Sequence, residues 1–298
     1  MTTAADYRAD VYPTRSDAEE WLPRLDPVVW SDASAGPIDA DGLKRFDAAG
    51  YLAIDELITA EQVRALRDEL VGLCSDERLR ADERTVIEPT SEQVRSIFEV
   101  HVLSPLVAEL IRDERVVGRA RQLLGSDVYV HQSRVNFKPG FAGKEFYWHS
   151  DFETWHAEDG MPRMRAVSIS ISLTDNYTYN GALMIMPGSH QTYVSCAGAT
   201  PEDNYKTSLR QQEIGTPSHE ALAGLYAQHG IDTLVGPAGG ATMFDSNCMH
   251  GSNGNISPLA RSNIFVVFNS VDNACQQPYA ARQPRPSFIG ARDFTPVR

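Results

Sequence analysis

Two histidines and an aspartate in this 298-residue chain have the types and spacing that suit a mononuclear metal centre. His149 and Asp151 are separated by a single residue, and two such positions on a strand project to the same side. With a distant histidine they would form a facial triad, which holds Fe(II) through three protein ligands and leaves the other positions open. His156 and Glu158 form a competing pair with the same spacing, so the motif alone does not decide between them.

A positively charged anchor beyond a third histidine favours the first pair. His250 is followed eleven residues later by Arg261, at the start of a run that is typical of a strand. A guanidinium there can hold the carboxylate of an acidic cosubstrate through two parallel hydrogen bonds. His156 and Glu158 have no matching anchor, and we interpret them as a structural pair or as support around the metal site.

A polar stripe runs along the strand expected at 128–137, and its side chains alternate toward one face. The pattern indicates either the wall of a wet pocket or an ordinary solvated face of an antiparallel sheet. Aromatic residues near the motif are likewise typical of a core or of a substrate pocket. The stripe consists of Gln132, Arg134, Asn136 and Lys138.

The periodicity of the chain predicts helices first and strands second. Helical spacing is expected over 39–49, and Gly50 is the expected end of this helix. A second helix is expected to begin at the capping box Thr59–Gln62, and further helical spacing covers 104–124. The period changes to 2 in the second half, for example over 166–173, where large apolar residues alternate with Ala and Ser. This order predicts a mainly β fold with bracing α-helices, a double-stranded β-helix or jelly-roll barrel of the cupin type.

The whole chain, 1–298, is predicted to form a single domain. Its expected parts are an N-terminal arm over 1–38, a mainly helical part over 39–125, a jelly-roll core over 126–275 and a C-terminal tail over 276–298. The core includes a long polar loop over 195–220, of the kind that forms a lid or is disordered.

The composition excludes several classes of protein. The chain has 27 Lys and Arg against 40 Asp and Glu, a net charge of −13, which disfavours binding to nucleic acid and to anionic membranes. Its apolar stretches are shorter than the roughly 20 residues that span a bilayer, and no leader segment is expected. The cysteines are far apart without a CxxC pair and are predicted to be free thiols in a reducing, cytoplasmic setting, at Cys74, Cys196, Cys248 and Cys275.

The segment from Phe146 to Pro162, FYWHSDFETWHAEDGMP, closely resembles the signature of ectoine hydroxylases. These enzymes belong to the phytanoyl-CoA dioxygenase superfamily of iron and 2-oxoglutarate enzymes. The resemblance covers nearly the whole chain, with further similar segments in the N-terminal arm, around Gln132, at 187–190 and from 249 to 263.

The resemblance implies a role for each candidate residue. It makes His149, Asp151 and His250 the iron ligands. It assigns the charged contacts to 2-oxoglutarate to Lys138 and Arg261, with Asn136, Arg134 and Ser252 as hydrogen-bonding neighbours. Gln132 and Trp155 would hold ectoine, and the expected pocket walls are Phe146, Phe244, Phe265, Ala166 and Ser168.

The implied reaction is hydroxylation of ectoine at ring carbon C5, with 2-oxoglutarate and O2 as cosubstrates and with release of succinate and CO2. Two alternatives stay open: a hydroxylase of another small zwitterion such as proline, and a non-catalytic barrel that binds a metal or ligand. A homodimer is a further expectation from the resemblance.

Overall fold

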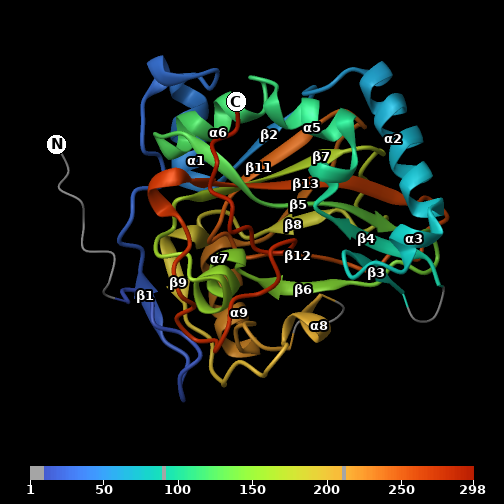
Figure 1. Cartoon of the computed structure of the whole chain (residues 1–298). Helices are drawn as coiled ribbons and strands as arrows, with labels where there is room; N and C mark the ends of the chain where they lie inside the picture. The colour runs from blue at the N-terminus through green and yellow to red at the C-terminus, as the bar shows by residue number, and fades with distance from the viewer. Residues whose placement is uncertain (1–9, 89–91, 210–212) are drawn as a thin grey trace.

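The computed structural model describes residues 10–88, 92–209 and 213–298. Two antiparallel sheets dominate it (Figure 1). The larger has seven strands, in the spatial order β2 (Tyr51–Ile54), β11 (Ala241–Asp245), β7 (Ala166–Ser172), β13 (Arg261–Ser270), β5 (Val128–Lys138), β4 (Val94–Phe98) and β3 (Thr85–Ile87). The smaller has four, β10 (Asp232–Leu234), β8 (Leu183–Ile185), β12 (His250–Ser252) and β6 (Phe146–His149).

The smaller sheet lies beneath the larger one in the view of Figure 1. This arrangement is the predicted jelly roll, although the described strands form two separate sheets and not one closed ring. A third, two-stranded sheet pairs β1 (Trp21–Pro23) with β9 (Thr192–Val194), so the N-terminal arm is attached to the jelly roll by a ladder of hydrogen bonds.

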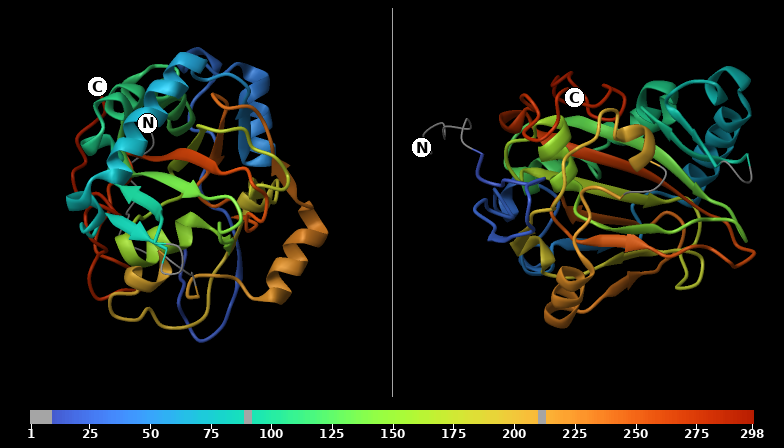
Figure 2. Two further views of the ribbon diagram at one scale, coloured as in Figure 1. Left: turned by 90° about the vertical axis from the view of Figure 1, so that its right-hand side faces the viewer. Right: turned by 90° about the horizontal axis from the view of Figure 1, so that it is seen from below.

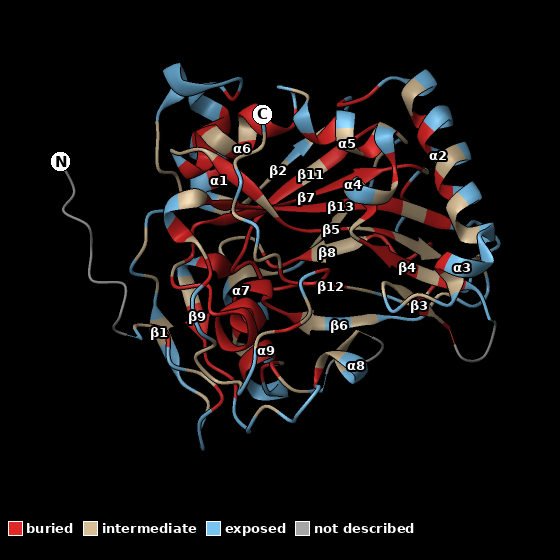
Figure 3. Ribbon diagram, in the orientation of Figure 1, coloured by how far each residue is buried: buried red, intermediate tan, exposed pale blue. Residues whose placement is uncertain are grey.

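Helices cover the outer face of the larger sheet, as Figures 1 and 2 show. Their apolar faces and the strands beneath them form the largest core, and these strands are buried along most of their length (Figure 3). Residues with a helical period and a capping signal form helices here because burial of one apolar face adds to the cap. The helices are α1 (Ala40–Ala49), α2 (Ala60–Ser75), α5 (Pro105–Arg112) and α6 (Val117–Leu124), with the short α3 (Glu77–Arg80) and α4 (Val100–Leu103) beside them.

The helix ends agree with the sequence signals. α1 ends at Gly50, whose φ of 78° is left-handed, and α2 begins with the capping box of Thr59 and Gln62. Residues 85–98 differ from the expected mainly helical part, because they form the hairpin of β3 and β4. That hairpin extends the larger sheet beyond β5, where Ser96 pairs with Asn136.

The remaining segments lie against the smaller sheet. α7 (Asp151–Thr154) continues into a π-helical turn (Trp155–Asp159) directly after β6. The polar loop contains one helical turn, α8 (Tyr205–Ser208), and α9 (His219–His229) begins within its predicted bounds. The C-terminal tail follows β5, since the Ala291 and Val297 amides donate to the His131 and Val128 carbonyls. Among the described residues, no helix is long and apolar enough to cross a membrane.

Candidate metal centre

Strand pairing brings the two candidate histidines together. His149 is the last residue of β6 and His250 the first of β12, and they are direct partners in the antiparallel register. Their ring centroids are 4.2 Å apart. Asp151 does not share a strand with His149, because the chain leaves β6 at Ser150 and begins α7. The expected reason for their proximity is therefore wrong, although the two side chains do meet.

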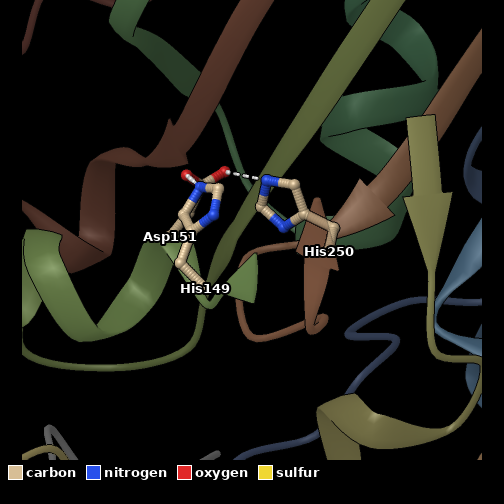
Figure 4. A group of neighbouring side chains, drawn as sticks. All are labelled: His149, Asp151 and His250. Atoms are coloured by element: carbon tan, nitrogen blue, oxygen red, sulfur yellow. Dashed lines mark ion pairs between the residues drawn. The ribbon is translucent and has the colours of Figure 1, made fainter. Parts of the chain in front are cut away.

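The three side chains form one buried cluster, in which each offers a ligand atom within 4.8 Å of the others. Both imidazole rings face the Asp151 carboxylate (Figure 4). Nε2 of His149 is 3.4 Å from Oδ1 of Asp151, and Nε2 of His250 is 3.8 Å from Oδ2.

Backbone carbonyls orient both rings. Nδ1 of His149 lies 2.8 Å from the Tyr147 carbonyl oxygen, and Nδ1 of His250 lies 3.0 Å from that of Cys248. A carbonyl only accepts, so each ring carries a proton on Nδ1, and its Nε2 is the atom directed at the cluster. This tautomer is the one that a metal ligand requires.

The electrostatics keep the cluster in the protonation state that binds a cation. Burial by itself would raise the pKa of Asp151, but His250, His149 and Arg134 outweigh it and lower that pKa well below its usual value. Burial, with His149 beside it, lowers the pKa of His250 to about 4, so this ring is neutral at pH 7. A carboxylate and neutral imidazole are thus available without loss of a proton.

A cavity of about 120 Å³ opens on the two histidines. Its wall is positively charged in a chain whose net charge is −13. The cations that line it are Arg95, Arg134, Lys138, Lys144 and Arg261. Among the described lining residues, Glu88 is the one carboxylate.

Lys138 and Arg261 are direct partners across β5 and β13. Nζ of Lys138 donates to Ser252 Oγ at 2.8 Å and to the Asn253 carbonyl at 2.6 Å. Arg261 is fixed by bonds from Nε to Asn176 Oδ1 at 2.9 Å and from Nη1 to the Gly181 carbonyl at 3.0 Å. Neither forms an ion pair with a carboxylate of the described residues.

The pKa values of both groups reflect the absence of such an ion pair. Burial, together with repulsion from Arg261 and Arg95, outweighs a weaker attraction to Glu145 and lowers the pKa of Lys138 to about 7. Burial also lowers the pKa of Arg261 to about 10. A small dianion in the cavity would relieve both shifts, because an opposite charge favours the protonated form.

Most of the other predicted residues line the same cavity, namely Arg134, Asn136, Ser252, Phe146, Phe244 and Phe265. The guanidinium of Arg134 lies over the Phe265 ring, 4.3 Å from its centroid. Asn136 accepts a hydrogen bond from Ser96 Oγ at 2.8 Å. The polar stripe on β5 is therefore a pocket wall from Arg134 to Lys138.

Besides Asp151 of the cluster, four predicted residues are absent from the cavity lining. Gln132 donates to the Ile289 carbonyl at 2.7 Å and accepts from Arg134 at 2.6 Å. Trp155 is buried, with its ring 5.4 Å from that of His131. The other two are Ala166, which is buried, and Ser168, whose Oγ is 3.4 Å from Asp151 Oδ2.

Sequence reasoning missed the contribution of β4 to the cavity. Arg95, Ser96 and Phe98 line it because β4 pairs with β5. Local periodicity does not reveal which strand a short strand will join, so these residues carried no signal. Asn263, by contrast, lines the cavity with Arg261 and Phe265, as alternation along that strand predicts.

The competing pair faces away from the cavity. His156 contacts Asp10 through Nε2 at 3.0 Å and the Met161 carbonyl through Nδ1 at 2.8 Å. Glu158 accepts from Arg15 at 3.2 Å and from Asn204 at 2.8 Å. These contacts tie the signature segment to the N-terminal arm and the polar loop.

Two facing antiparallel sheets around a buried His, Asp, His cluster define a jelly-roll protein with a mononuclear metal site. The sequence pattern of the phytanoyl-CoA dioxygenase (PhyH) family matches residues 46–263. The chain belongs to this family.

Curated relatives match over the full length. The chain is 59% identical over 299 residues to an ectoine dioxygenase of Streptomyces coelicolor, with 100% of both chains covered. It is 50% identical over 283 residues to the ectoine dioxygenase of Halomonas elongata, covering 94% of this chain and 85% of the relative.

Solved structures match as well. EctD from S. alaskensis, crystallised with 2-oxoglutarate and 5-hydroxyectoine, is 45% identical and superimposes with a TM-score of 0.88 over 97% of both chains. The same protein with bound Fe gives a TM-score of 0.88 at 44% identity, covering 97% of this chain and 98% of that one. The carbocyclase SnoK, at 19% identity and a TM-score of 0.59 over 81% of this chain and 87% of its own, shares the fold.

Proposed function

We propose that this chain is an Fe(II)- and 2-oxoglutarate-dependent dioxygenase that hydroxylates ectoine to 5-hydroxyectoine. The observation that carries the proposal is the buried cluster of His149, Asp151 and His250 at a cavity whose wall holds Lys138 and Arg261 side by side. The similarity to ectoine dioxygenases and to EctD in complex with 2-oxoglutarate and 5-hydroxyectoine supports the choice of substrate.

The donor set fits ferrous iron. Two imidazole Nε2 atoms and one carboxylate oxygen form the ligand set typical of non-haem Fe(II) oxygenases. When bound, iron would supply the activation of O2 that is coupled to oxidation of 2-oxoglutarate to succinate and CO2. The two atoms of O2 end in the new hydroxyl group and in succinate, which balances the reaction. The part of the protein is to orient the reactants and to exclude side reactions.

Lys138 and Arg261 would bind the distal carboxylate of 2-oxoglutarate. Their side chains lie at partner positions of adjacent strands, and neither is neutralised by a carboxylate in contact among the described residues. A guanidinium held by two acceptors is preorganised to donate its remaining N–H groups to a carboxylate. The hydrogen-bonding neighbours proposed for the cosubstrate are Asn136, Arg134 and Ser252, all at the cavity wall.

Ectoine carries a delocalised cation and a carboxylate and has no net charge. Aromatic side chains suit such a cation, since a desolvated cation–π contact contributes about 1–2 kcal/mol. We propose Gln132 and Trp155 as the residues that hold ectoine. The proposed walls are Phe146, Phe244, Phe265, Ala166 and Ser168, of which the first three line the cavity.

The decisive experiment is aerobic incubation of purified protein with Fe(II), 2-oxoglutarate and ectoine, followed by mass spectrometry of the product. The proposal expects ectoine to gain one oxygen atom, with an equal amount of succinate. Succinate formation with proline or another zwitterion but not with ectoine would change the substrate. No oxygen consumption with any of them would indicate a non-catalytic binding protein.

We also propose that the protein is a single domain over 1–298, that it acts in the cytoplasm and that it forms a homodimer. The four unpaired cysteines suit a reducing compartment. Backbone bonds from the arm to Cys196 and from the tail to β5 support a single folding unit. Sedimentation equilibrium tests the dimer.

A further inference from the structure

A buried arginine of the N-terminal arm grips the segment that carries Asp151. Glu153 lies two residues beyond Asp151 in α7. Arg15 meets its carboxylate with two parallel bonds, Nε to Oε1 at 2.5 Å and Nη2 to Oε2 at 2.8 Å, and both side chains are 1% exposed. Thr14 adds a hydroxyl bond to Oε1 at 2.7 Å. This fork-to-carboxylate geometry fixes the orientation of α7 at its first turn.

Arg15 is itself held from several sides. Its backbone is left-handed, with φ of 59°, an uncommon conformation for a residue with a side chain. Its amide donates to the Cys196 carbonyl at 2.7 Å, and Nη1 donates to Thr200 Oγ1 at 3.2 Å. Nη2 also reaches Glu158 at 3.2 Å. Strained backbone of this kind persists where surrounding contacts over-determine it, often near functional sites.

A second arginine of the N-terminal arm, Arg24, forms an ion pair with the turn that leads to His250. Nη1 of Arg24 lies 2.8 Å from Asp245 Oδ1, with side-chain exposures of 2% and 3%. The other nitrogens of Arg24 donate to the carbonyls of Asp26 and Met164, both at 2.9 Å. Asp245 in turn accepts from the Asn247 amide at 2.8 Å, and its carbonyl accepts from the Cys248 amide at 3.0 Å.

The turn over 245–248, which leads to His250, also contacts the segment that carries His149 and Asp151. Ser150, between His149 and Asp151, donates to Asn247 Oδ1 at 3.0 Å. The Phe152 amide donates to the Ser246 carbonyl at 2.9 Å. Arg15 contacts Glu153 and Arg24 contacts Asp245. Through these two carboxylates, both arginines hold the segments that carry the cluster of His149, Asp151 and His250.

We infer that Arg15 and Arg24 are positioning residues of the metal centre, Arg15 acting on Asp151 through Glu153 and Arg24 acting on His250 through Asp245. The inference rests on the proposed function, since it takes the cluster to bind Fe(II). Removal of the water around two charges is costly, so a buried ion pair is a weak stabiliser of a fold. Its fixed geometry is what suits it to orient a ligand.

The test measures Fe(II) affinity by anaerobic calorimetry in Arg15→Lys, Arg15→Met, Arg24→Lys and Arg24→Met, with thermal unfolding of each metal-free protein. Partners that orient metal ligands typically change metal affinity about 10- to 100-fold when they are lost. We expect such weakening in the Met variants. A smaller loss, about 3- to 10-fold, is expected in the Lys variants, which keep the charge but lose the fork.

Arg165→Met is the matched control. Arg165 is buried to the same extent as Arg15, with 8% of the whole residue exposed in each, but it contacts the Leu124 carbonyl, Asp272 and the Trp30 ring. We expect it to lower the unfolding temperature while Fe(II) affinity stays within about 2-fold of wild type, the scatter of context-dependent effects. If a Met variant does not fold, the Lys variant at that position decides.

Lys variants that bind Fe(II) as tightly as wild type would overturn the inference, even with lowered unfolding temperatures. So would an Arg165→Met variant that loses Fe(II) affinity as much as the others, because the effect would then be general destabilisation. Failure of the proposed function gives a different result, since wild-type protein would then leave ectoine unchanged, whatever the Fe(II) affinities of the variants.

Discussion

His149 and His250 are cross-strand partners, and their rings lie 4.2 Å apart between centroids on adjacent antiparallel strands. Each ring is anchored through Nδ1 to a carbonyl two residues earlier in its own chain segment. A metal at the Nε2 side would therefore bind to a preformed pair, with only the Asp151 carboxylate contributed from outside the sheet.

Loss of any one of His149, Asp151 and His250 to Ala is expected to reduce Fe(II) affinity by more than about 100-fold, beyond the effect of losing a partner that orients a ligand. Turnover should be lost with it. Calorimetry with Fe(II) and succinate release measure the two quantities. His219→Ala, an exposed histidine at the start of α9, is the control and should match wild type. Full turnover by any triad variant would contradict the assignment.

Arg261→Ala is expected to raise KM for 2-oxoglutarate while Fe(II) affinity stays unchanged. A hydrogen bond to a charged group contributes about 1.5–3 kcal/mol, which corresponds to about a 10- to 100-fold rise. Steady-state kinetics with varied 2-oxoglutarate give the value. Arg261→Lys should recover part of it, because the charge is kept and the fork is lost. An unchanged KM in Arg261→Ala would remove the anchor role.

The binding of 2-oxoglutarate should take up a proton at Lys138. Its pKa is lowered to about 7 by burial and by Arg261 and Arg95, and a bound dianion would raise it. The complex then holds more protons than the free protein above pH 7. The affinity for 2-oxoglutarate is therefore highest below pH 7. It falls by up to about tenfold per pH unit between pH 7 and the raised pKa of Lys138 in the complex.

Calorimetry near pH 8 in buffers of different ionisation enthalpy measures this uptake. Lys138→Arg is the control, since a guanidinium stays protonated and the proton uptake should disappear. Equal proton uptake in the variant and the wild type would assign it to another group.

Trp155→Leu tests whether this buried ring serves the substrate or only the core. Leucine keeps apolar volume but removes the π face, so we expect weaker ectoine binding together with continued, uncoupled consumption of 2-oxoglutarate. Stability should fall by about 1–3 kcal/mol, because Trp155 packs against His131. Ectoine titration and the ratio of succinate to hydroxylated product measure the effect. Unchanged ectoine affinity would leave Trp155 as a core residue.

Local sequence signals predicted the elements that depend on local contacts. The helix end at Gly50, the capping box at Thr59 and the alternation along β7 and β13 are all properties of a few neighbouring residues. Alternation along β5 likewise placed Lys138 on one face with Arg134 and Asn136, whereas the resemblance paired it with Arg261, its partner on β13 in the structure.

Contacts between distant segments were not predictable in this way. The pairing of β4 with β5, the start of α7 at Asp151 and the bond of Arg15 to Glu153, 138 residues away, depend on which segments the folded chain brings together. No short-range period contains that information, so Arg95 was missed and the arm was treated as an appendage.

The positive wall of the cavity has a consequence for work in concentrated electrolyte. Dissolved ions weaken attraction between exposed charges beyond roughly 8 Å at physiological strength, and over shorter distances as salt rises. Arg261, 8% exposed, is largely sheltered from such ions. As salt concentration rises, binding of a small dianion at Arg261 should therefore weaken less than the long-range electrostatic effect of the acidic surface.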